Sequence, residues 1–449
     1  MRKTLYVVCL MALLVGATAC NSDNNGSGDS SRDCAVTSVV MGRLSRVYHG
    51  YLSDGRDTTY TTNVWGQYYP LHIDQLRREI FNSDSLPVGT KLDKVYFNTF
   101  ASDGILAYRL ESGKDTLFNI KDTLDFTTPR IFTVYTSDGS GTREYVMRIN
   151  VHNADPEGYS WRQAAPADDK IAAMQDMRLI MGDGKMMLWG HSGGQALYME
   201  RTLTDGDAWS SYTIDGVSSL STANVQSFNG KYYAPTDGGL ACSADGHSWS
   251  VVAPELTGAR IMGTAGGSLY VISGGKVWFS TDALSWTEDS VDDKTAPLPD
   301  EYVGGAYLPS ANNANVGNLI CVGYHSGLSE TWKKEVNLVY PEAMPWSYYP
   351  ATEETPRTLP YLGSMSLMPY DGKLMVIGQT ADTLNVYTSS DGARSWQKVT
   401  RPDVIPSGAG RQTAVAWTAD GDDTIWLVGA PAGILWRGYL NRMKAQTEE

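Results

Sequence analysis

The chain contains few of the residues that build disulfide frameworks and metal sites. Its 449 residues include 5 cysteines and 6 histidines, and the histidines are scattered rather than set at ligand spacing. Beyond the N-terminus the cysteines are Cys34, Cys242 and Cys321, too widely spaced for a disulfide-built fold. One disulfide among them is possible, but three buried thiols are the better interpretation. No glycine-rich phosphate loop precedes a helical pattern, and neither a metal nor a cofactor is expected. Calcium is the alternative, on the Asp-rich turns with Asp205 and Asp207 or with Asp420, Asp422 and Asp423.

Positive charge is also scarce. The sequence holds 36 Lys and Arg residues against 50 Asp and Glu residues, a formal net charge of −14. Proteins bind nucleic acid mainly by neutralising its phosphates with Lys and Arg, so a nucleic-acid partner is not expected. The same acidic balance argues against docking on anionic lipid head groups.

A long apolar run stands at the N-terminus. Arg2 and Lys3 precede apolar residues 5–19, and small residues then lead to Cys20. This order is typical of a secretory signal, since the run is shorter than the ~20 residues of a membrane-spanning helix; a short retained helix is the alternative. The end of the run resembles a bacterial lipobox, which implies that residues 1–19 are removed and that Cys20 is acylated. At ~0.8 kcal/mol per buried methylene, two or more acyl chains hold a protein firmly on a membrane.

Residues 20–33 form a polar segment after the lipobox. The segment is rich in Asn, Asp, Ser and Gly, and this composition predicts a flexible tether. A lipobox followed by such a tail resembles the cell-envelope lipoproteins of Bacteroidota. The resemblance implies a lipid anchor in the cell envelope, at the outer membrane, on either its periplasmic or its surface face.

Residues 34–153 predict one β-domain. Two β-rich runs, 131–136 and 142–151, flank an Asp-Gly-containing loop, which indicates a hairpin. The hairpin resembles the last two strands of Ig-like domains found in many such lipoproteins, and it implies an Ig-like β-sandwich. Residues 73–82 break the strand pattern and predict a short helix that Asp74 caps.

Residues 154–442 are repetitive. Tryptophans begin similar segments at intervals of 48, 40, 37, 60 and 50 residues, and tight turns precede six apolar strands. Repeats of about 40 to 50 residues with several short strands each are typical of β-propeller blades. The sequence therefore predicts an all-β protein whose second domain is a six-bladed propeller, with residues 443–449 as a polar tail. The tryptophans are Trp161, Trp209, Trp249, Trp286, Trp346 and Trp396.

The last repeat lacks a tryptophan-led outer strand before the end of the chain. We predict that residues 159–164, at the start of the repetitive region, supply the missing strand. Such a pairing would close the ring across the two ends of the domain and would remove two exposed sheet edges.

A shared turn stands before four of the tryptophans. It reads Ser-Ala-Asp-Gly-His-Ser-Trp at residues 243–249 and Ser-Asp-Gly-Ala-Arg-Ser-Trp at residues 390–396. This turn resembles the Asp-box of sialidase-like propellers. In such a turn the carboxylate accepts backbone N–H groups, the Gly takes a positive φ and the Trp packs between blades. The predicted structural residues are Asp205, Asp245, Asp282 and Asp391 with Trp209, Trp249, Trp286 and Trp396.

No catalytic site is evident in the sequence. Sialidases carry an Arg-Ile-Pro motif, and the nearest approach, Ala-Arg-Ile-Met at residues 259–262, does not match it. The Asp-box resemblance therefore implies a fold and not an activity. Glycoside hydrolysis needs two opposed carboxylates, and spacing alone cannot select a pair from 50 acidic residues. His191 follows an apolar run and either faces the central channel or simply ends a strand.

Aromatic side chains are the remaining binding candidates. The interval after Trp286 is the longest, which indicates an inserted loop, and insertions fall on one face of a propeller. Tyrosine and tryptophan rings suit sugars and peptides, and ordinary core packing is the competing interpretation. The candidates are Trp332, Tyr348, Tyr349 and Tyr361 in this repeat and Trp65, Tyr68 and Tyr69 in the first domain.

As a whole, the chain resembles an uncharacterised Bacteroidota cell-envelope lipoprotein family that joins an N-terminal Ig-like domain to an Asp-box or kelch-like propeller. The resemblance brings no assigned activity. The first hypothesis is a non-catalytic binding module for a glycan or a protein partner. The alternatives are a scaffold subunit of an outer-membrane complex and a glycan-active enzyme with an unrecognised carboxylate pair.

Overall fold

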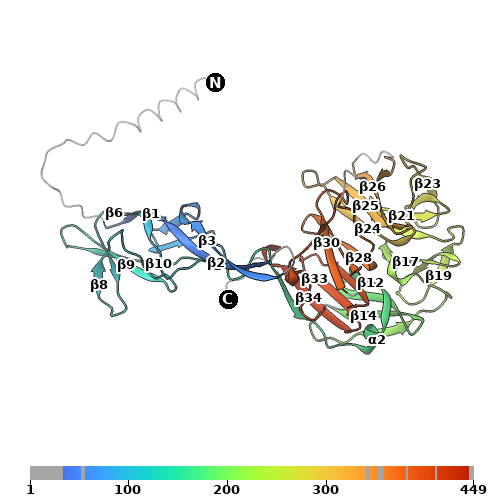
Figure 1. Ribbon diagram of the computed structural model, residues 1–449, viewed down its shortest axis with the longest axis horizontal. Coiled ribbons are helices and arrows are strands. Elements are labelled where there is room, and N and C mark those ends of the chain that lie inside the picture. The colour runs from blue at the N-terminus through green and yellow to red at the C-terminus, as the bar shows by residue number, and fades with distance from the viewer. Residues whose placement is uncertain are drawn as a thin grey trace, which may run out of the picture. The chain divides into compact units, whose positions relative to one another are not determined.

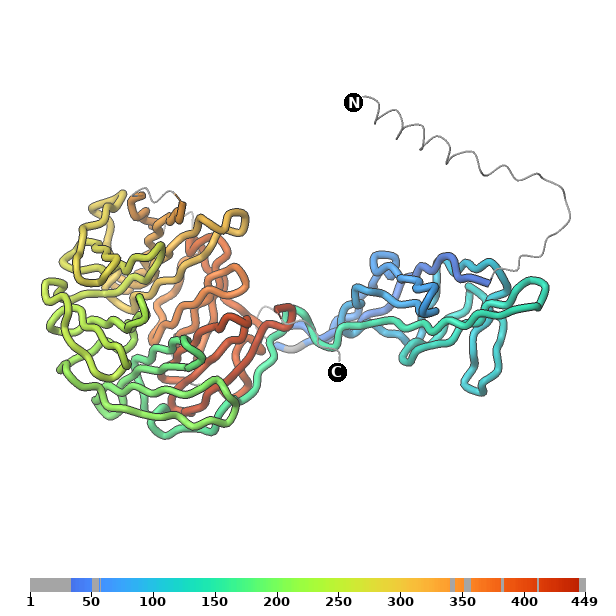
Figure 2. The backbone as a smooth tube through the Cα atoms, turned by 180° about the vertical axis from the view of Figure 1, so that it is seen from behind, coloured from blue at the N-terminus to red at the C-terminus, as the bar shows by residue number. Residues whose placement is uncertain are grey.

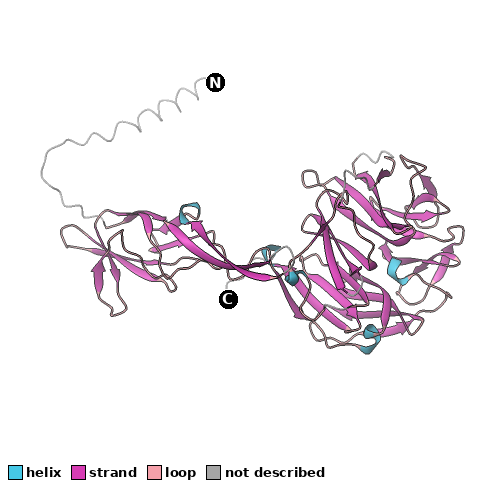
Figure 3. Ribbon diagram, in the orientation of Figure 1, coloured by secondary structure: helices cyan, strands magenta, loops and turns pink. Residues whose placement is uncertain are grey.

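The computed structural model describes residues 34–51, 56–339, 344–350, 357–380, 383–409 and 412–443. The predicted signal peptide, Cys20, the tether and all but the first residue of the predicted tail lie outside these ranges. Strands dominate the described chain, which confirms the predicted all-β class (Figure 3). Within the described ranges, no helix is both long and apolar enough to cross a membrane. The three cysteines are buried thiols and not disulfides.

The chain divides into two compact units, which are described separately. Unit 1 comprises residues 34–49 and 59–153, and unit 2 comprises residues 50–58 and those from 154 onward. The short helical elements of the described chain are η1 (Gly66–Tyr68), α2 (Asp169–Ala172), η2 (Thr222–Asn224), η3 (Pro402–Val404) and η4 (Asn441–Met443).

Unit 1 contains a six-stranded sheet in the order β4-β5-β10-β9-β7-β8, together with the strand pair β1-β6 and most of the pair β2-β3 (Figure 1). Its hydrophobic core includes Tyr145 and Met147, which lie two positions apart and so on the same face of β10. The strands are β1 (Val36–Met41), β2 (Arg43–Tyr51), β3 (Asp57–Trp65), β4 (Leu71–Asp74), β5 (Glu79–Asn82), β6 (Phe97–Ser102), β7 (Ile105–Arg109), β8 (Asp115–Leu117), β9 (Arg130–Tyr135) and β10 (Thr142–Met147).

The short helix predicted at residues 73–82 is wrong. Strands β4 and β5 form an antiparallel hairpin there. Asp74 does cap, but it caps the hairpin turn: its carboxylate accepts hydrogen bonds from the backbone N–H of Leu76 at 2.9 Å and of Arg77 at 2.8 Å. Strand β5 pairs in turn with β10, and Ile80 is fully buried. Pairing with a distant strand thus overrides the local helix signal.

Unit 2 contains six four-stranded antiparallel sheets among its described residues, and they follow one another around a common centre as in a β-propeller (Figure 2). The first sheet has β12 (Met174–Gly182), β13 (Lys185–Ser192), β14 (Gln195–Thr202) and β15 (Ser210–Thr213). The second has β16 (Gln226–Phe228), β17 (Lys231–Thr236), β18 (Gly239–Ser243) and β19 (Ser250–Ala253). The third has β20 (Arg260–Ala265), β21 (Ser268–Ser273), β22 (Lys276–Ser280) and β23 (Thr287–Asp289).

The other three sheets repeat this order. The fourth has β24 (Glu301–Pro309), β25 (Val316–His325), β26 (Leu328–Asn337) and β27 (Ser347–Tyr349). The fifth has β28 (Gly363–Tyr370), β29 (Lys373–Thr380), β30 (Thr383–Ser389) and β31 (Gln397–Lys398). The last sheet combines the two ends of the unit: β32 (Ala414–Ala419), β33 (Ile425–Ala430), β34 (Ile434–Leu440) and β11 (Tyr159–Gln163).

The closing strand lies where the sequence places it. Strand β11 pairs antiparallel with β34, with Trp161 opposite Gly438. A β-carbon on Gly438 would come within 2.3 Å of the Trp161 ring, so only glycine lets this ring lie on the strand. The Trp161 indole N–H donates to the Asp403 carbonyl at 2.9 Å, and Arg401 forms ion pairs with Asp403 and Asp155. Contacts to the segment between the fifth and last sheets therefore hold β11 and the residues before it in place.

Tight turns join the first two strands of several sheets. Asp183 and Gly184, between β12 and β13, have φ of 51° and 71°, and Asp371 with Gly372 repeats this geometry. Positive φ at both central residues is the type I′ turn, whose twist matches that of the flanking strands. The Asp-Gly sequence thus favours the same turn that the antiparallel pairing of the two strands requires.

Three of the four carboxylates predicted as box residues accept hydrogen bonds from backbone N–H groups. The Asp245 carboxylate accepts backbone N–H groups of His247 and Ser248, and Asp282 and Asp391 do the same for residues two to four positions later. Asp205 departs from this pattern, because its carboxylate forms ion pairs with Arg162 at 2.5 Å and Arg437 at 3.7 Å. The four tryptophans are buried or half-buried.

The box turn predicts an acid-sensitive part of the stability. Hydrogen bonds from the backbone N–H of Ser285 and Leu284 lower the pKa of Asp282 from 3.8 to about 2. Since the folded-state pKa is depressed, this contribution is present above about pH 4 and is lost as the pH falls through about 2. We expect the melting temperature of Asp282→Asn, measured by circular dichroism, to fall less between pH 4 and pH 2 than that of the wild type. Parallel losses in the two proteins would contradict this assignment.

Candidate functional site

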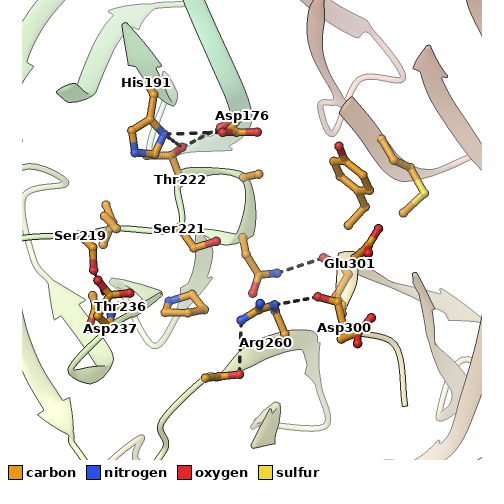
Figure 4. Close-up of a pocket in the computed structure, with 18 of the residues that line it drawn as sticks. Asp176, His191, Ser219, Ser221, Thr222, Thr236, Asp237, Arg260, Asp300 and Glu301 are labelled. Carbon is orange, nitrogen blue, oxygen red and sulfur yellow. Dashed lines mark hydrogen bonds and ion pairs between the residues drawn. The ribbon is translucent and has the colours of Figure 1, made fainter. Parts of the chain in front are cut away.

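A pocket of about 870 Å³ opens at the centre of unit 2 (Figure 4). The first strands of the six sheets, β12, β16, β20, β24, β28 and β32, surround this centre. The pocket is lined by the beginnings of several of these strands, the ends of β13 and β17, and η2. Its size is typical of small-molecule sites.

Backbone bulges shape the pocket rim. The pairing of the first two strands shifts register between Gln175 and Arg178, between Glu301 and Gly304, and between Gly363 and Ser366. In each bulge a residue other than glycine takes a positive φ: Asp176 at 50°, Tyr302 at 46° and Ser364 at 53°. Such residues cost about 1–2 kcal/mol each and concentrate at functional sites. Bulges re-aim side chains, and here Asp176 and Tyr302 line the pocket.

The strain at Tyr302 gives a direct prediction. Both Tyr302→Gly and Tyr302→Ala remove the ring, but only glycine tolerates the positive φ without strain. We expect the glycine variant to be more stable than the alanine variant by about 1 kcal/mol in urea unfolding. The matched pair Tyr212→Gly and Tyr212→Ala, on regular strand β15, should give the opposite order, because glycine weakens a regular strand.

One side of the pocket is aromatic. Tyr361 is 46% exposed, and its ring lies 5.9 Å from that of Tyr302 and 4.9 Å from that of Tyr324. The Tyr361 hydroxyl donates to the Glu301 carboxylate at 2.8 Å, and this hydrogen bond raises the pKa of Tyr361 to about 12. The phenol therefore stays protonated at neutral pH and keeps Glu301 beside the exposed ring.

The opposite side is polar. The His191 Nδ1 atom lies 2.9 Å from the Thr222 hydroxyl, which donates to the Asp176 carbonyl at 2.8 Å. The Asp176 carboxylate is 4.0 Å from the same imidazole nitrogen (Figure 4). Of the two interpretations of His191, the structure supports a side chain that lines the central pocket. An arrangement of this kind can exchange hydrogen bonds with a polar ligand.

Asn224, in η2, joins the third and fourth sheets at the pocket. Its amide nitrogen donates to the carbonyls of Ile261 at 3.1 Å and Val303 at 3.0 Å, and its oxygen accepts the Ile261 N–H at 2.6 Å. Arg260 donates to the Asp300 carbonyl at 3.1 Å. The walls are thus held by hydrogen bonds between separate sheets, which keeps the site preformed.

Two family domains match this chain: a domain of unknown function, the DUF6242 N-terminal domain, at residues 40–149, and the DUF6242 β-propeller domain at residues 155–448. The chain belongs to the DUF6242 family. This match confirms the predicted propeller and the predicted membership in an uncharacterised family. The DUF6242 chain has no match among the curated proteins.

Several solved structures are similar to the DUF6242 chain in fold. A protein of unknown function from Bacteroides thetaiotaomicron is 9% identical, with 82% of this chain and 98% of that chain covered and a TM-score of 0.39. A putative gluconolactonase is 12% identical over 63% and 92% of the chains, at a TM-score of 0.37. A thermostable family-43 glycoside hydrolase is 13% identical over 59% and 88%, at a TM-score of 0.30.

Of the aromatic candidates in the fourth repeat of the DUF6242 chain, only Tyr361 lines the pocket. Trp332 has no exposed ring surface. Its side chain is 0% exposed, its indole N–H donates to the Pro297 carbonyl at 3.0 Å, and its ring packs on Tyr348. Core packing, the competing interpretation, accounts for this residue.

The other candidates are distributed over the molecule. Tyr348 donates its hydroxyl to Glu330 at 2.7 Å, and the Arg394 guanidinium lies 4.6 Å from the centre of the Tyr349 ring. In unit 1, Trp65 and Tyr68 are exposed, whereas Tyr69 packs against the core. None of these residues lines the central pocket.

The DUF6242 chain has no cluster of three or more His, Cys, Asp or Glu residues placed to hold a metal ion within its described ranges. The sequence did not single out Glu301 and Tyr302. A usable signal was present, because each stands where the first strand of a repeat begins.

Proposed function

We propose that this protein is a glycan-binding protein of the cell envelope and that the central pocket of the propeller is its site. The observation that carries the proposal is the pair of Tyr302 and Tyr361, whose rings meet edge to face at the pocket, with the Glu301 carboxylate hydrogen-bonded to the Tyr361 hydroxyl. Sugar rings stack on tyrosine faces, and a carboxylate accepts hydrogen bonds from their hydroxyl groups. The strained bulge at Tyr302 supports a site maintained for function.

The charge of the pocket favours a neutral glycan. Four carboxylates line it, from Asp176, Asp237, Asp300 and Glu301, against the cation of Arg260. A uronic or sulfated sugar would place further negative charge beside them, and like-charge juxtaposition costs several kcal/mol. Uncharged sugars have no such penalty and can donate hydroxyl hydrogens to every one of these acids.

The wider setting belongs to the same proposal. The six four-stranded sheets of unit 2 would be six blades, and unit 1 would be an Ig-like sandwich that acts as a spacer. Acylation of Cys20 would anchor the chain at the outer membrane. The order of charged residues, apolar run and small residues before Cys20 supports this anchor.

Glycoside hydrolysis is the second candidate function. The observation that favours it is the presence of several carboxylates in one pocket, which is the minimum that an acid and a base or nucleophile require. Release of sugar distinguishes this function from binding alone.

The experiment is a binding screen of the soluble protein, residues 34–449, against neutral and acidic polysaccharides, with reducing sugar assayed in parallel. We expect retention of a neutral polysaccharide. Tyr361→Ala should weaken the affinity about tenfold, the equivalent of the ~1.4 kcal/mol that an aromatic contact supplies. The control Trp65→Ala, an exposed ring of unit 1, should bind like the wild type.

Three outcomes would contradict glycan binding at this pocket. Sugar release that Glu301→Gln abolishes would replace the binding proposal by hydrolysis. Equal loss in Tyr361→Ala and Trp65→Ala, or no retention of any polysaccharide, would contradict the proposed site and leave a protein partner as the explanation for the pocket.

A further inference from the structure

A second, smaller cavity of about 250 Å³ lies deeper in the channel of unit 2. It is lined by residues further along the same first strands that begin at the central pocket, so the sheets surround it. Each of the six first strands contributes to it. One residue from each, in chain order, is Arg178, Gln226, Thr264, Gly305, Leu367 and Thr418.

Arg178 brings a positive charge into this cavity. Its Nε atom is buried and has no hydrogen-bond partner among the described residues. One terminal nitrogen lies 3.4 Å from the Gln226 side-chain oxygen, which is a long contact. Burial lowers the pKa of Arg178. Arginine nevertheless stays protonated in proteins, so the side chain cannot lose its charge to escape the cost of burial.

No carboxylate balances this charge. The residues that line the cavity include neither Asp nor Glu, and the described chain shows no ion pair to Arg178. Arg401 provides the contrast, since its guanidinium is flanked by Asp155 at 3.0 Å and Asp403 at 2.8 Å. Arg178 is only partly exposed, and charges withdrawn from water in proteins are normally paired. The site therefore calls for a counterion from outside the chain.

We propose that the channel binds a small inorganic anion, of the halide class, against the guanidinium of Arg178. The Nε–H group has no protein acceptor and donates to this anion. The side chains of Gln226, Thr264 and Thr418, on three further strands, supply neutral N–H and O–H donors around the same space. Because the donors come from different sheets, the anion links the strands at the centre of the ring.

This site is distinct from the pocket proposed for glycans. The pocket is lined by four carboxylates, which repel anions, whereas the deeper cavity is lined by one cation and neutral groups. The proposed anion site therefore does not depend on the proposed glycan binding, and each can be tested separately.

The test uses the full-length protein and bromide as the probe. Melting temperature is measured against bromide concentration at constant ionic strength, with fluoride as the balancing halide because its strong hydration disfavours a partly apolar cavity. We expect a saturable rise of melting temperature in bromide. Arg178→Met should abolish the bromide dependence, and Arg178→Lys should retain part of it. Arg162→Met, which removes an exposed arginine of β11, should keep the wild-type dependence.

Crystals grown in bromide give a second readout that needs no variant. An anomalous peak within hydrogen-bond distance of the Arg178 guanidinium would support the proposal. The absence of a peak there, or a bromide dependence that is identical in the wild type and Arg178→Met, would overturn it.

Discussion

Loss of the closing strand should be the most damaging change to the propeller. Replacing residues 159–163 by a Gly-Ser segment of equal length is expected to lower the melting temperature of unit 2 by about 10 °C or more. The replacement removes the pairing of β11 with β34 and the packing of Tyr159 and Trp161 against the neighbouring core. A loss near 5 kcal/mol in a domain of this size corresponds to such a shift.

A single substitution gives a graded version of the same test. In Gly438→Val the added side chain would collide with the Trp161 ring, and overpacking of this kind costs about 1–3 kcal/mol. Differential scanning calorimetry should show a smaller shift than for the strand replacement. An unchanged melting temperature after replacement of residues 159–163 would contradict the closure of the ring by this strand.

Breaking the buried ion pair of the third and fourth sheets should have the second-largest effect. The Lys334 ammonium lies 2.8 Å from the Asp289 carboxylate, and their side chains are 9% and 5% exposed. Lys334 also donates to the Met344 carbonyl at 2.7 Å, and the Trp346 indole N–H donates to Asp289 at 3.0 Å. Lys334→Met leaves Asp289 buried without its counterion, so we expect a loss of about 3–5 kcal/mol.

The neighbouring pair of Lys276 and Glu288 is a matched control. The Lys276 ammonium lies 2.6 Å from the Glu288 carboxylate, a similar separation, but the two side chains are 53% and 51% exposed. Exposed pairs contribute about 0–1 kcal/mol, so Lys276→Met should change stability little. In urea unfolding, the double variant Lys334→Met/Asp289→Asn should recover part of the loss. Similar losses for Lys334→Met and Lys276→Met would show that burial of the first pair has no energetic consequence.

The repeat architecture was predictable because its signals are local. Asp245, Gly246 and Trp249 stand within one turn, and the tight turn at Asp183 and Gly184 selects its own backbone geometry. Closure by residues near Trp161 followed from counting strands. Each inference required only neighbouring residues and a repeat length.

The functional residues were harder to predict because they depend on where distant strands meet. In the sequence, Trp332 cannot be told apart from an exposed tryptophan that binds a ligand. In the structure its side chain is completely buried. Asp176 and Tyr302 enter the pocket only because a bulge reverses the alternation of their strands. The hairpin at β4 and β5 shows the same limit, since pairing with β10 outweighs the helix signal around Asp74.

The most direct test of the central claim is a crystal structure of the protein bound to the neutral oligosaccharide that it retains most strongly. The account predicts a sugar ring stacked on Tyr361 or Tyr302, with a hydroxyl group of the sugar donating to Glu301. A sugar ordered elsewhere, for example on Trp65 and Tyr68 of unit 1, with the central pocket free of it, would contradict the account.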